Sequence, residues 1–194
     1  MTLVDRLRAA LAAPPSEAMI AGDLPEARAL ATIPAAVLIA LTEREEPGVI
    51  LTVRTKTLRT HAGQIAFPGG RIDPGEDGFS AALREAQEEL DLDPSAVTIA
   101  GSLDEYRTVT GYVVTPVVGV VDPDLRLTPH DHEVADWFEA PLVHLLDPSN
   151  HRLETAVFAG RQRRYWQIEW NERRIWGASA AMLVNLSRRL RWAR

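Results

Sequence analysis

The order of apolar and polar positions predicts alternating strands and helices. Residues 34–41 (PAAVLIAL) and 48–54 (GVILTVR) are apolar runs of strand length, and the polar sequence 45–47 (EEP) separates them. Such runs bounded by turn residues are typical of buried strands, so these two predict a hairpin. Residues 112–121 predict another strand, in which Pro116 favours an edge position or a bulge because proline donates no hydrogen bond. The remaining predicted elements are strands at 96–100 and 132–138, a short helix at 141–146, a hairpin at 157–170 and a final helix at 177–192.

The amino-terminal region predicts a helix outside the main domain. Leu3, Leu7 and Leu11 recur every four residues, which is the spacing of an amphipathic helix. A chain of 194 residues is normally one domain, and no internal repeat or linker divides it. We therefore expect residues 1–30 to form a helical extension packed on a single domain that spans residues 31–194.

The composition narrows the chemistry and the cellular location. The chain contains no cysteine, which excludes disulfides, thiolate zinc sites and cysteine nucleophiles and fits a reducing cytoplasm. Residues 1–15 are too short and too evenly charged for a secretory signal, and no apolar run approaches the length that spans a membrane. We expect a cytoplasmic protein without a membrane partner.

Charge is distributed unevenly along the chain. The net charge is −6, yet residues 152–194 contain ten arginines and three glutamates. A basic region of this kind can bind nucleic acid or a phosphorylated ligand. Alternatively, the arginines pair with the acidic remainder of the protein, within the chain or across a homodimer. We favour pairing and argue against nucleic acid as a partner, because net negative charge weakens attraction to a phosphate backbone.

Residues 78–91 predict a helix that gathers three carboxylates. At about 100° per residue, Glu85, Glu88 and Glu89 fall within roughly one quadrant of such a helix. Like charges at this spacing repel, so something must offset the cost. Carboxylate oxygens are preferred ligands of Mg²⁺ and Mn²⁺, and Mg²⁺ is often shared with substrate phosphates. The pattern therefore favours a divalent metal site.

The flanking residues agree with a helix at this position. Asp77 is suited to cap its amino-terminus, and Asp93 precedes a proline, which disfavours further helix. The apolar face points away from the glutamates and is expected to pack on the core. It comprises Phe79, Leu83, Ala86 and Leu90.

A glycine-rich loop leads into the predicted helix. Gly69 and Gly70 permit close approach of the backbone to a ligand, and such a loop can lay amides and carbonyls against a metal-bound diphosphate. The alternative is a solvated acidic helix face, which is the commoner explanation of a charge run. The glycine loop, the upstream Glu76 and the apolar back face together favour the metal site.

The spacing of these residues resembles the Nudix box. That box runs Gly, five residues, Glu, seven residues, then Arg-Glu-apolar-any-Glu-Glu-any-Gly-apolar, a long and specific pattern. The chain departs from it at Asp91, where the family has glycine, so the departure concerns the helix exit rather than the metal face. Within residues 70–92 the matches are Gly70, Glu76, Arg84, Glu85, Ala86, Glu88, Glu89 and Leu92.

A second motif, residues 51–70, is similar to the signature of the coenzyme A pyrophosphatase branch of Nudix hydrolases. The branch has Arg-Ser where this chain has Arg54 and Thr55, a change that keeps a hydroxyl and adds a methyl. The resemblance covers nearly the whole chain, from about residue 34 to about residue 190. Further matches are Thr110, Gly111, Tyr112, Pro116 and residues 175–180.

The resemblance implies an α/β protein with the Nudix fold, in which a mixed β-sheet is sandwiched between α-helices. It also implies a hydrolase that uses Mg²⁺ or Mn²⁺ to neutralise a diphosphate and to activate water. We expect Glu85 and Glu89 to be the principal metal ligands. Glu88 is expected to be a ligand or a base, and Glu76 to join through a water or a second metal.

The roles of the remaining charged residues are less narrowly defined. Arg84 is expected to orient a metal-binding glutamate; otherwise it makes a surface ion pair of little value to stability. The general base varies between branches of the family, so its identity stays open. Glu133 and Glu139, from the late acidic segment, are the alternatives to Glu88.

The branch implies cleavage of coenzyme A to 4′-phosphopantetheine and adenosine 3′,5′-bisphosphate. The 3′-phosphate requires a cation, and Arg54 and Arg59 are the predicted partners because arginine binds phosphate through two hydrogen bonds. His61 and Gln64 either add polar contacts or only hold the loop. Tyr112 either stacks on adenine or packs in the sheet.

Two other functions stay open. The first is a Nudix hydrolase of another nucleoside diphosphate derivative, such as a dinucleotide, a nucleotide sugar, an oxidised nucleotide or capped RNA. The second is a non-catalytic binding module with the same fold. Residues 51–70 favour coenzyme A, and the complete set of box glutamates favours catalysis.

Trp166, Trp170 and Trp176 suit either the core or the interface of a homodimer.

Overall fold

The computed structural model of the protein describes residues 1–15, 19–23, 32–55, 63–130, 132–158 and 160–191. The strands are β1 (Ile33–Thr42), β2 (Gly48–Arg54), β3 (Ile65–Ala66), β4 (Gly69–Arg71), β5 (Val97–Ser102), β6 (Tyr106–Arg107), β7 (Tyr112–Val121), β8 (Val134–Pro141), β9 (Arg152–Phe158), β10 (Arg161–Trp170) and β11 (Arg173–Trp176). The α-helices are α1 (Leu3–Ala12), α3 (Gly78–Leu90), α4 (Leu142–Leu146) and α5 (Ala178–Arg189), with 3-10 turns at Pro94–Ala96 and Pro148–Asn150. None of these described helices is long and apolar enough to cross a membrane.

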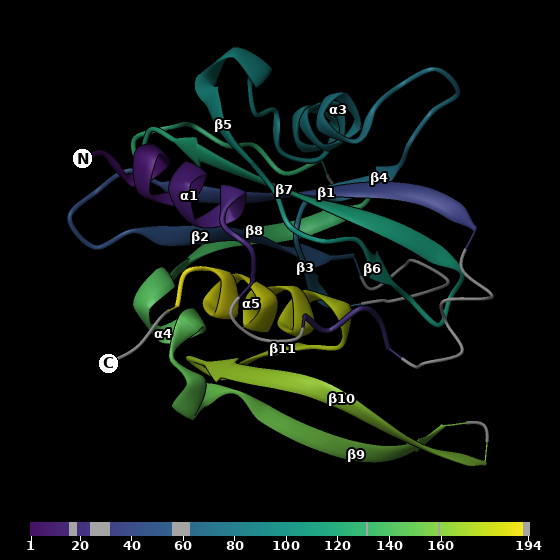
Figure 1. Ribbon diagram of the computed structural model, residues 1–194. Helices are drawn as coiled ribbons and strands as arrows, with labels where there is room; N and C mark the ends of the chain where they lie inside the picture. Colours follow the sequence, from purple (N-terminus) through teal and green to yellow (C-terminus); the bar gives the residue numbers. More distant parts are fainter. Residues whose placement is uncertain (16–18, 24–31, 56–62, 131, 159, 192–194) are drawn as a thin grey trace.

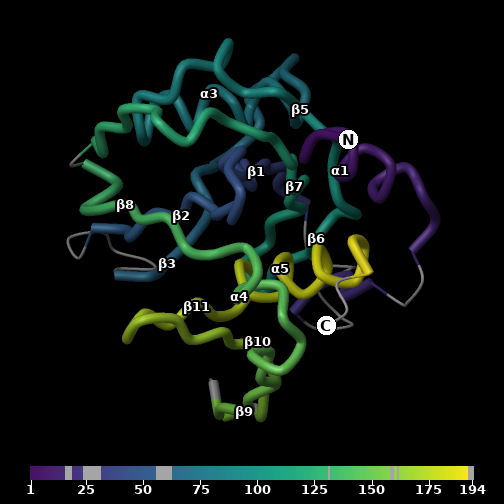
Figure 2. The backbone as a smooth tube through the Cα atoms, turned by 90° about the vertical axis from the view of Figure 1, so that its left-hand side faces the viewer, coloured from purple at the N-terminus to yellow at the C-terminus, as the bar shows by residue number. Residues whose placement is uncertain are grey.

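A mixed sheet between helices forms the centre of the fold (Figure 1). Eight of the described strands compose it: the order is β3-β2-β1-β7-β5, and β8, β4 and β6 pair with β2, β1 and β7. β1 runs parallel to β7 along its whole length, whereas the other pairs are antiparallel. Figure 2 shows α3 on one side of this sheet and α5 on the other. The predicted α/β architecture, with a mixed sheet between helices, is confirmed.

Two apolar cores form, one on each face of the sheet, because successive side chains of a strand point to opposite faces. Along β1, Ile39 and Leu41 enter the larger core, which α5 covers. Leu38 and Ala40 enter the smaller core, which α3 covers. Burial on both faces explains why β1 is a nearly continuous apolar run rather than an alternating one.

β7 is an interior strand, so the edge position predicted for Pro116 is wrong. Pro116 pairs with Val37 of β1 on one side. On the other side, β6 pairs with Val113 and Val114, and the pairing of β5 begins at Val117. The proline therefore lies opposite the break between two short neighbours, where its missing N–H removes no regular ladder bond.

Most predicted elements are present, with shifted ends. The strand expected at 132–138 is β8, which ends at Pro141, and the hairpin expected at 157–170 is the longer pair β9–β10. Sequence patterns did not predict the four shortest strands, because strands of two to four residues are too short to show a period. These strands are β3, β4, β6 and β11.

The helix α3 buries most of the predicted apolar face, with Ala86 and Leu90 buried and Leu83 packed on the smaller core. Asp77 caps it by accepting a hydrogen bond from the Ser80 amide at 2.7 Å. Phe79 is 39% exposed, so its assignment to the core is wrong, and Glu89 is buried instead. The buried side of α3 therefore includes one of its acidic residues. Its buried apolar residues are Ala81, Ala82, Ala86 and Leu90.

The end of α3 has a left-handed backbone. Asp91 has φ 58° and ψ 28°, and its N–H bonds to the carbonyls of Ala86 and Gln87. Glycine is favoured at such a position because it has no Cβ, and aspartate is one of the few other residues that adopt this conformation readily. The glycine of the box is therefore a backbone requirement, and Asp91 fulfils it.

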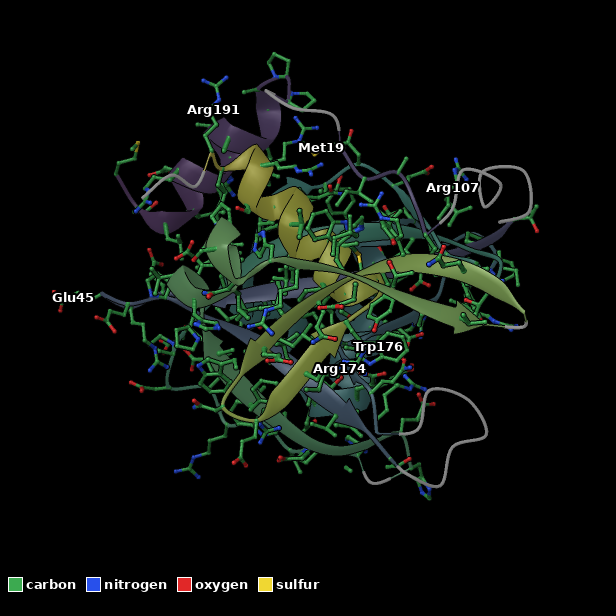
Figure 3. All side chains as sticks on the ribbon, turned by 90° about the horizontal axis from the view of Figure 1, so that it is seen from below. Met19, Glu45, Arg107, Arg174, Trp176 and Arg191 are labelled. Atoms are coloured by element: carbon green, nitrogen blue, oxygen red, sulfur yellow. The ribbon has the colours of Figure 1, made fainter. Side chains whose placement is uncertain are left out.

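Several described arginines of the carboxy-terminal region contact acids or aromatic rings. The sheet β11-β10-β9 lies beneath α5 (Figure 1). Figure 3 shows Arg174 and Trp176 on the underside of the molecule, where the guanidinium carbon lies 5.2 Å from the ring centre. These contacts agree with pairing rather than with a bare basic surface. Ion pairs join Arg152 to Glu169 at 3.5 Å, Arg173 to Asp136 at 3.4 Å and Arg189 to Asp104 at 2.8 Å.

The described amino-terminal residues are tied to the domain at several places. Leu7 of α1 is buried in the larger core. Farther along, the buried side-chain amide of Asn185 in α5 holds both backbone groups of Ile20. It accepts from the Ile20 N–H at 2.8 Å and donates to the Ile20 carbonyl at 2.9 Å. The Asn185 side chain thus satisfies the backbone N–H and carbonyl of Ile20 as a neighbouring strand would.

Removal of this amide should destabilise the protein. In Asn185→Ala and in Asn185→Leu, the Ile20 N–H and carbonyl lose their partners, and we expect the free energy of unfolding in urea to fall by about 1–3 kcal/mol. The leucine variant keeps most of the side-chain volume and so separates hydrogen bonding from cavity formation. Wild-type stability of Asn185→Leu would contradict the assigned role.

Candidate active site

Separate segments bring acidic, basic and glycine residues together at one end of the central sheet. Backbone pairing sets their positions: the Thr55 amide donates to the Glu133 carbonyl at 2.9 Å, which joins the end of β2 to the start of β8. β4 pairs with β1, and α3 contacts both strands. The contributors are Glu85 and Glu89 from α3, Gly70 from β4, Arg54 from β2, and Glu133 from the segment before β8.

The carboxylate of Glu89 is buried without adequate compensation. The residue is 3% exposed, and neither side-chain oxygen has a hydrogen-bond partner among the described residues. The Gly69 amide lies nearby but does not reach hydrogen-bond geometry. Burial raises the pKa of Glu89 to about 8, and the neighbouring Arg54 opposes this rise. The site therefore favours additional positive charge beside Glu89.

Arg54 approaches two carboxylates without bonding to either. Its Nη1 lies 3.9 Å from Oε1 of Glu89, and its Nη2 lies 3.8 Å from Oε2 of Glu133. Its Nε is buried and has no partner within the described part of the chain. These separations exceed hydrogen-bond length, so the contacts are electrostatic and only loosely directed.

Arg84, in contrast, is fully engaged. Its Nε and Nη2 donate to the two carboxylate oxygens of Glu76, each at 3.1 Å, and Nη2 also donates to the Arg71 carbonyl at 2.9 Å. Its Nη1 donates to Glu85 at 2.8 Å and to Glu88 at 3.1 Å. The bond from Arg84 lowers the pKa of Glu76. One guanidinium thus positions three of the four box glutamates and ties α3 to β4.

Two glycines make room for this arrangement. A Cβ on Gly70 would lie 2.4–2.5 Å from the carboxylate atoms of Glu85. A Cβ on Gly69 would lie 2.4 Å from the Ala36 carbonyl oxygen in the neighbouring strand. Burial raises the pKa of Glu85, and Arg84 opposes that rise. Gly70 is therefore needed for close approach of the backbone to the Glu85 carboxylate, and Gly69 for close approach of β4 to β1.

The residues present fit a hard divalent cation. Among the described residues, no three acidic or histidine side chains converge as a ready metal site, because Arg84 draws Glu85 and Glu88 towards itself. The donors are nevertheless carboxylates, the ligands that Mg²⁺ and Mn²⁺ prefer. The unpartnered oxygens of Glu89 and the raised pKa of Glu85 both indicate negative charge that a cation would balance.

A family model described as the NUDIX domain matches residues 32–159. The chain belongs to the Nudix hydrolase family. It is 42% identical over 154 residues to Nudix hydrolases named NudL from Cronobacter sakazakii and Escherichia coli strain K12, which spans 79% of this chain and 80% of each relative. Both relatives are described as uncharacterized. The Nudix hydrolase RenU from M. smegmatis has a similar fold, with a TM-score of 0.51 and 23% identity over 59% of this chain and 74% of that one.

These similarities place the protein in the NudL-like branch of the Nudix family. Nudix hydrolases generally use divalent metal ions, which agrees with the chemistry of the carboxylates in the box. The family model ends at residue 159, so the long strand β10, β11 and α5 lie beyond the matched residues.

Glu139 lies away from the Nudix box. Its side chain accepts hydrogen bonds from Thr42 at 2.6 Å and from Arg44 at 3.0 Å. Glu139 pairs with Ile50 in the β2–β8 ladder, whereas Arg54 lies at the other end of β2. Of the two late acidic residues predicted as bases, the structure therefore brings only Glu133 to the box.

The structure describes only some of the other residues predicted to bind substrate. Arg59 and His61 lie outside the described residues. Gln64 contributes its backbone: its carbonyl accepts from the Arg54 amide at 2.9 Å. The Tyr112 hydroxyl accepts from Arg71 at 3.3 Å, and the Arg71 guanidinium carbon lies 5.8 Å from the ring centre.

Arg71 is the site residue that sequence patterns did not single out. Its carbonyl accepts from Arg84, and its side chain contacts Tyr112. The residue directly follows Gly70, so its position inside the box was the available signal. A variable position in a motif carries no residue-type information, however, and the contact of a backbone carbonyl is invisible in sequence.

Substitution of Gly70 should damage the metal site more than the fold. In Gly70→Ala the new methyl group would displace the flexible Glu85 side chain rather than backbone. We expect Mn²⁺ affinity, measured by calorimetry, to fall by about 10- to 100-fold and the thermal transition to change little.

Gly48→Ala is a matched control, because its Cβ would collide with Glu139 at the far end of β2. Its Mn²⁺ affinity should equal that of wild type. Unaltered Mn²⁺ affinity in Gly70→Ala would show that the position of Glu85 does not matter for metal binding.

Proposed function

We propose that the protein is a metal-dependent diphosphatase that cleaves coenzyme A or its derivatives to 4′-phosphopantetheine and adenosine 3′,5′-bisphosphate. The observation that carries this proposal is the meeting of two motifs. Arg54, from the segment that resembles the coenzyme A branch, faces Glu89, from the Nudix box, at 3.9 Å. Residues 51–70 and the box therefore serve one site, as a diphosphate substrate with a further phosphate would require.

Glu85 and Glu89 are the proposed principal ligands of Mg²⁺ or Mn²⁺. A divalent cation supplies neutralisation of the diphosphate charge and a lower pKa for an attacking water. Arg84 holds Glu85 and Glu88 in position, and Glu76 acts through its bidentate bond to Arg84 or joins through a water or a second metal. Gly69 and Gly70 admit the diphosphate close to the backbone.

Glu88 and Glu133 are the proposed candidates for the general base. Glu88 is exposed and shares one oxygen with Arg84, so its other oxygen is available to a water or a cation. Glu133 is also exposed; burial is the main cause of the raised pKa values of Glu85 and Glu89, and the negative charge of Glu133 adds to both. Both therefore lie within reach of the reaction centre.

Substrate binding is assigned to residues around the box. Arg54 and Arg59 are proposed to contact phosphate, since arginine forms two hydrogen bonds to it. His61 and Gln64 are proposed to add polar contacts. Tyr112, whose ring is half-buried and whose hydroxyl accepts from Arg71, is proposed to stack on adenine.

The proposal includes the organisation of the molecule. Residues 31–194 act as one Nudix domain, and residues 1–30 form an extension packed on it. A cytoplasmic location is consistent with a chain that lacks cysteine. A homodimer is the proposed assembly, for which the exposed Trp176 on the underside is a suitable contact.

A panel of diphosphates tests the substrate. We expect purified protein with Mg²⁺ or Mn²⁺ to release adenosine 3′,5′-bisphosphate from coenzyme A, and to cleave 3′-dephospho-coenzyme A, ADP-ribose, NADH and a nucleoside triphosphate more slowly, as chromatography would show. Glu89→Gln and excess chelator should each lower turnover by about 100-fold or more.

Efficient turnover of another member of the panel, with little cleavage of coenzyme A, would redirect the assignment to that substrate. Absence of metal-dependent turnover of any member would favour the binding module.

The two candidate bases can be separated by kinetics. Substitution of the base by glutamine should lower kcat by about 10²- to 10⁴-fold and leave Mn²⁺ affinity nearly unchanged. A ligand substitution should weaken Mn²⁺ binding as well. We therefore expect one of Glu88→Gln and Glu133→Gln to show a kcat defect alone, and Glu139→Gln to behave as wild type. Equal, mild effects of both would eliminate them as bases.

A further inference from the structure

The two arginines of the site differ in how completely they are bonded. Every nitrogen of Arg84 donates to a carboxylate or a carbonyl, at 2.8–3.1 Å. Arg54 donates to neither of its acidic neighbours, which lie 3.8–3.9 Å away, and its buried Nε has no described partner. Arg84 is therefore fixed by hydrogen bonds, whereas Arg54 makes only electrostatic contact with its two acidic neighbours.

The position of Arg54 is that of a counter-ion. Glu89 is buried and its carboxylate accepts no hydrogen bond from the described residues. An isolated buried charge is unfavourable, and the Arg54 guanidinium is the cation that approaches it and lowers its pKa. The same guanidinium lies within 3.9 Å of both Glu89 and Glu133, so it interacts with both acids at once.

We propose that Arg54 is an exchangeable counter-ion of the metal site. It neutralises Glu89 and Glu133 while the site holds no divalent cation. When a cation binds at Glu89, repulsion between the two positive charges directs the guanidinium towards the phosphate oxygens of the substrate. This inference rests on the proposed function, since it takes the cation and the diphosphate from there.

The exchange has a thermodynamic consequence. A guanidinium that competes for Glu89 lowers the affinity of the free protein for the cation. A diphosphate that accepts the guanidinium removes this competition, so substrate and cation each strengthen the binding of the other. Arg54 thereby contributes to the coupling between two ligands as well as to the affinity for one of them.

Calorimetry of Mn²⁺ binding tests the competition directly. We expect Arg54→Gln to bind Mn²⁺ alone about three- to tenfold more tightly than wild type, because the competing charge is gone. Arg54→Lys keeps that charge and should bind Mn²⁺ as wild type does. Arg44→Gln is the matched control: Arg44 also pairs with a glutamate, Glu139, but at the other end of β2.

The second half of the inference is tested by adding methylenediphosphonate, a diphosphate analogue that is not hydrolysed. In wild type it should strengthen Mn²⁺ binding, and in Arg54→Gln this gain should shrink by about tenfold, the loss of one bidentate contact. Thermal unfolding without metal provides an independent readout, in which Arg54→Gln should be less stable than wild type and should gain more from Mn²⁺. If Arg54→Gln does not fold, Arg54→Met is used in its place, because methionine keeps the aliphatic stem of the side chain.

Unchanged or weaker binding of Mn²⁺ alone by folded Arg54→Gln, or by Arg54→Met in its place, would overturn the inference, even if coenzyme A is cleaved. Suppose that Arg54→Gln binds Mn²⁺ more tightly and gains less from methylenediphosphonate, but that the protein does not cleave coenzyme A. This result would support the role of Arg54 as a counter-ion and refute only the proposed substrate. No Mn²⁺ binding by wild type would refute both.

Discussion

The close approach of α3 to the central sheet is the constraint on which the site depends. Small residues permit it: Ala81, Ala82 and Ala86 face the sheet, and a Cβ on Gly78 would already touch Thr115 at 3.1 Å. At this distance the Glu85 carboxylate lies against Gly70 of β4, and Glu89 is buried. Larger side chains at these positions would move the helix outward and separate the acids from the glycine segment.

Close packing also explains why the acidic residues are arranged unequally. Glu89 lies on the buried side of α3 and receives little compensation, whereas Glu88 is exposed. Arg84 resolves part of the repulsion between neighbouring acids by bonding to Glu76, Glu85 and Glu88 together. The uncompensated charge is thereby concentrated on one residue, where a cation has the greatest effect.

The sequence predicted the local features of the site well. The period of α3, the cap at Asp77 and the β1–β2 hairpin all follow from short-range rules, and the structure contains them. Which residues of different strands lie side by side could not be predicted from the sequence, because this depends on the register of strand pairing. Whether Glu133 or Glu139 meets the box is decided by the pairing of β2 with β8, and no pattern within either strand encodes it.

The same limit applies to the buried face of α3. Phe79 fits an apolar stripe by period but is 39% exposed, whereas Ala81, Ala82 and Glu89, which lie outside that stripe, are buried. A period identifies a stripe of apolar residues and does not identify the surface that will receive it. Departures of this kind are expected at functional sites, where chemistry overrides the simplest packing.

The parallel pairing of β1 with β7 has a consequence for assembly of the site during folding. Ile33 pairs with Tyr112, so one side of β1 stays open until β7 has been synthesised. Contacts between residues so distant in the chain form slowly, because loop closure precedes them. Glu133 follows β7 and reaches the box only when β8 pairs with β2. A nascent chain thus carries the complete acidic helix well before it has a complete site, and its final acidic residue arrives with closure of the sheet.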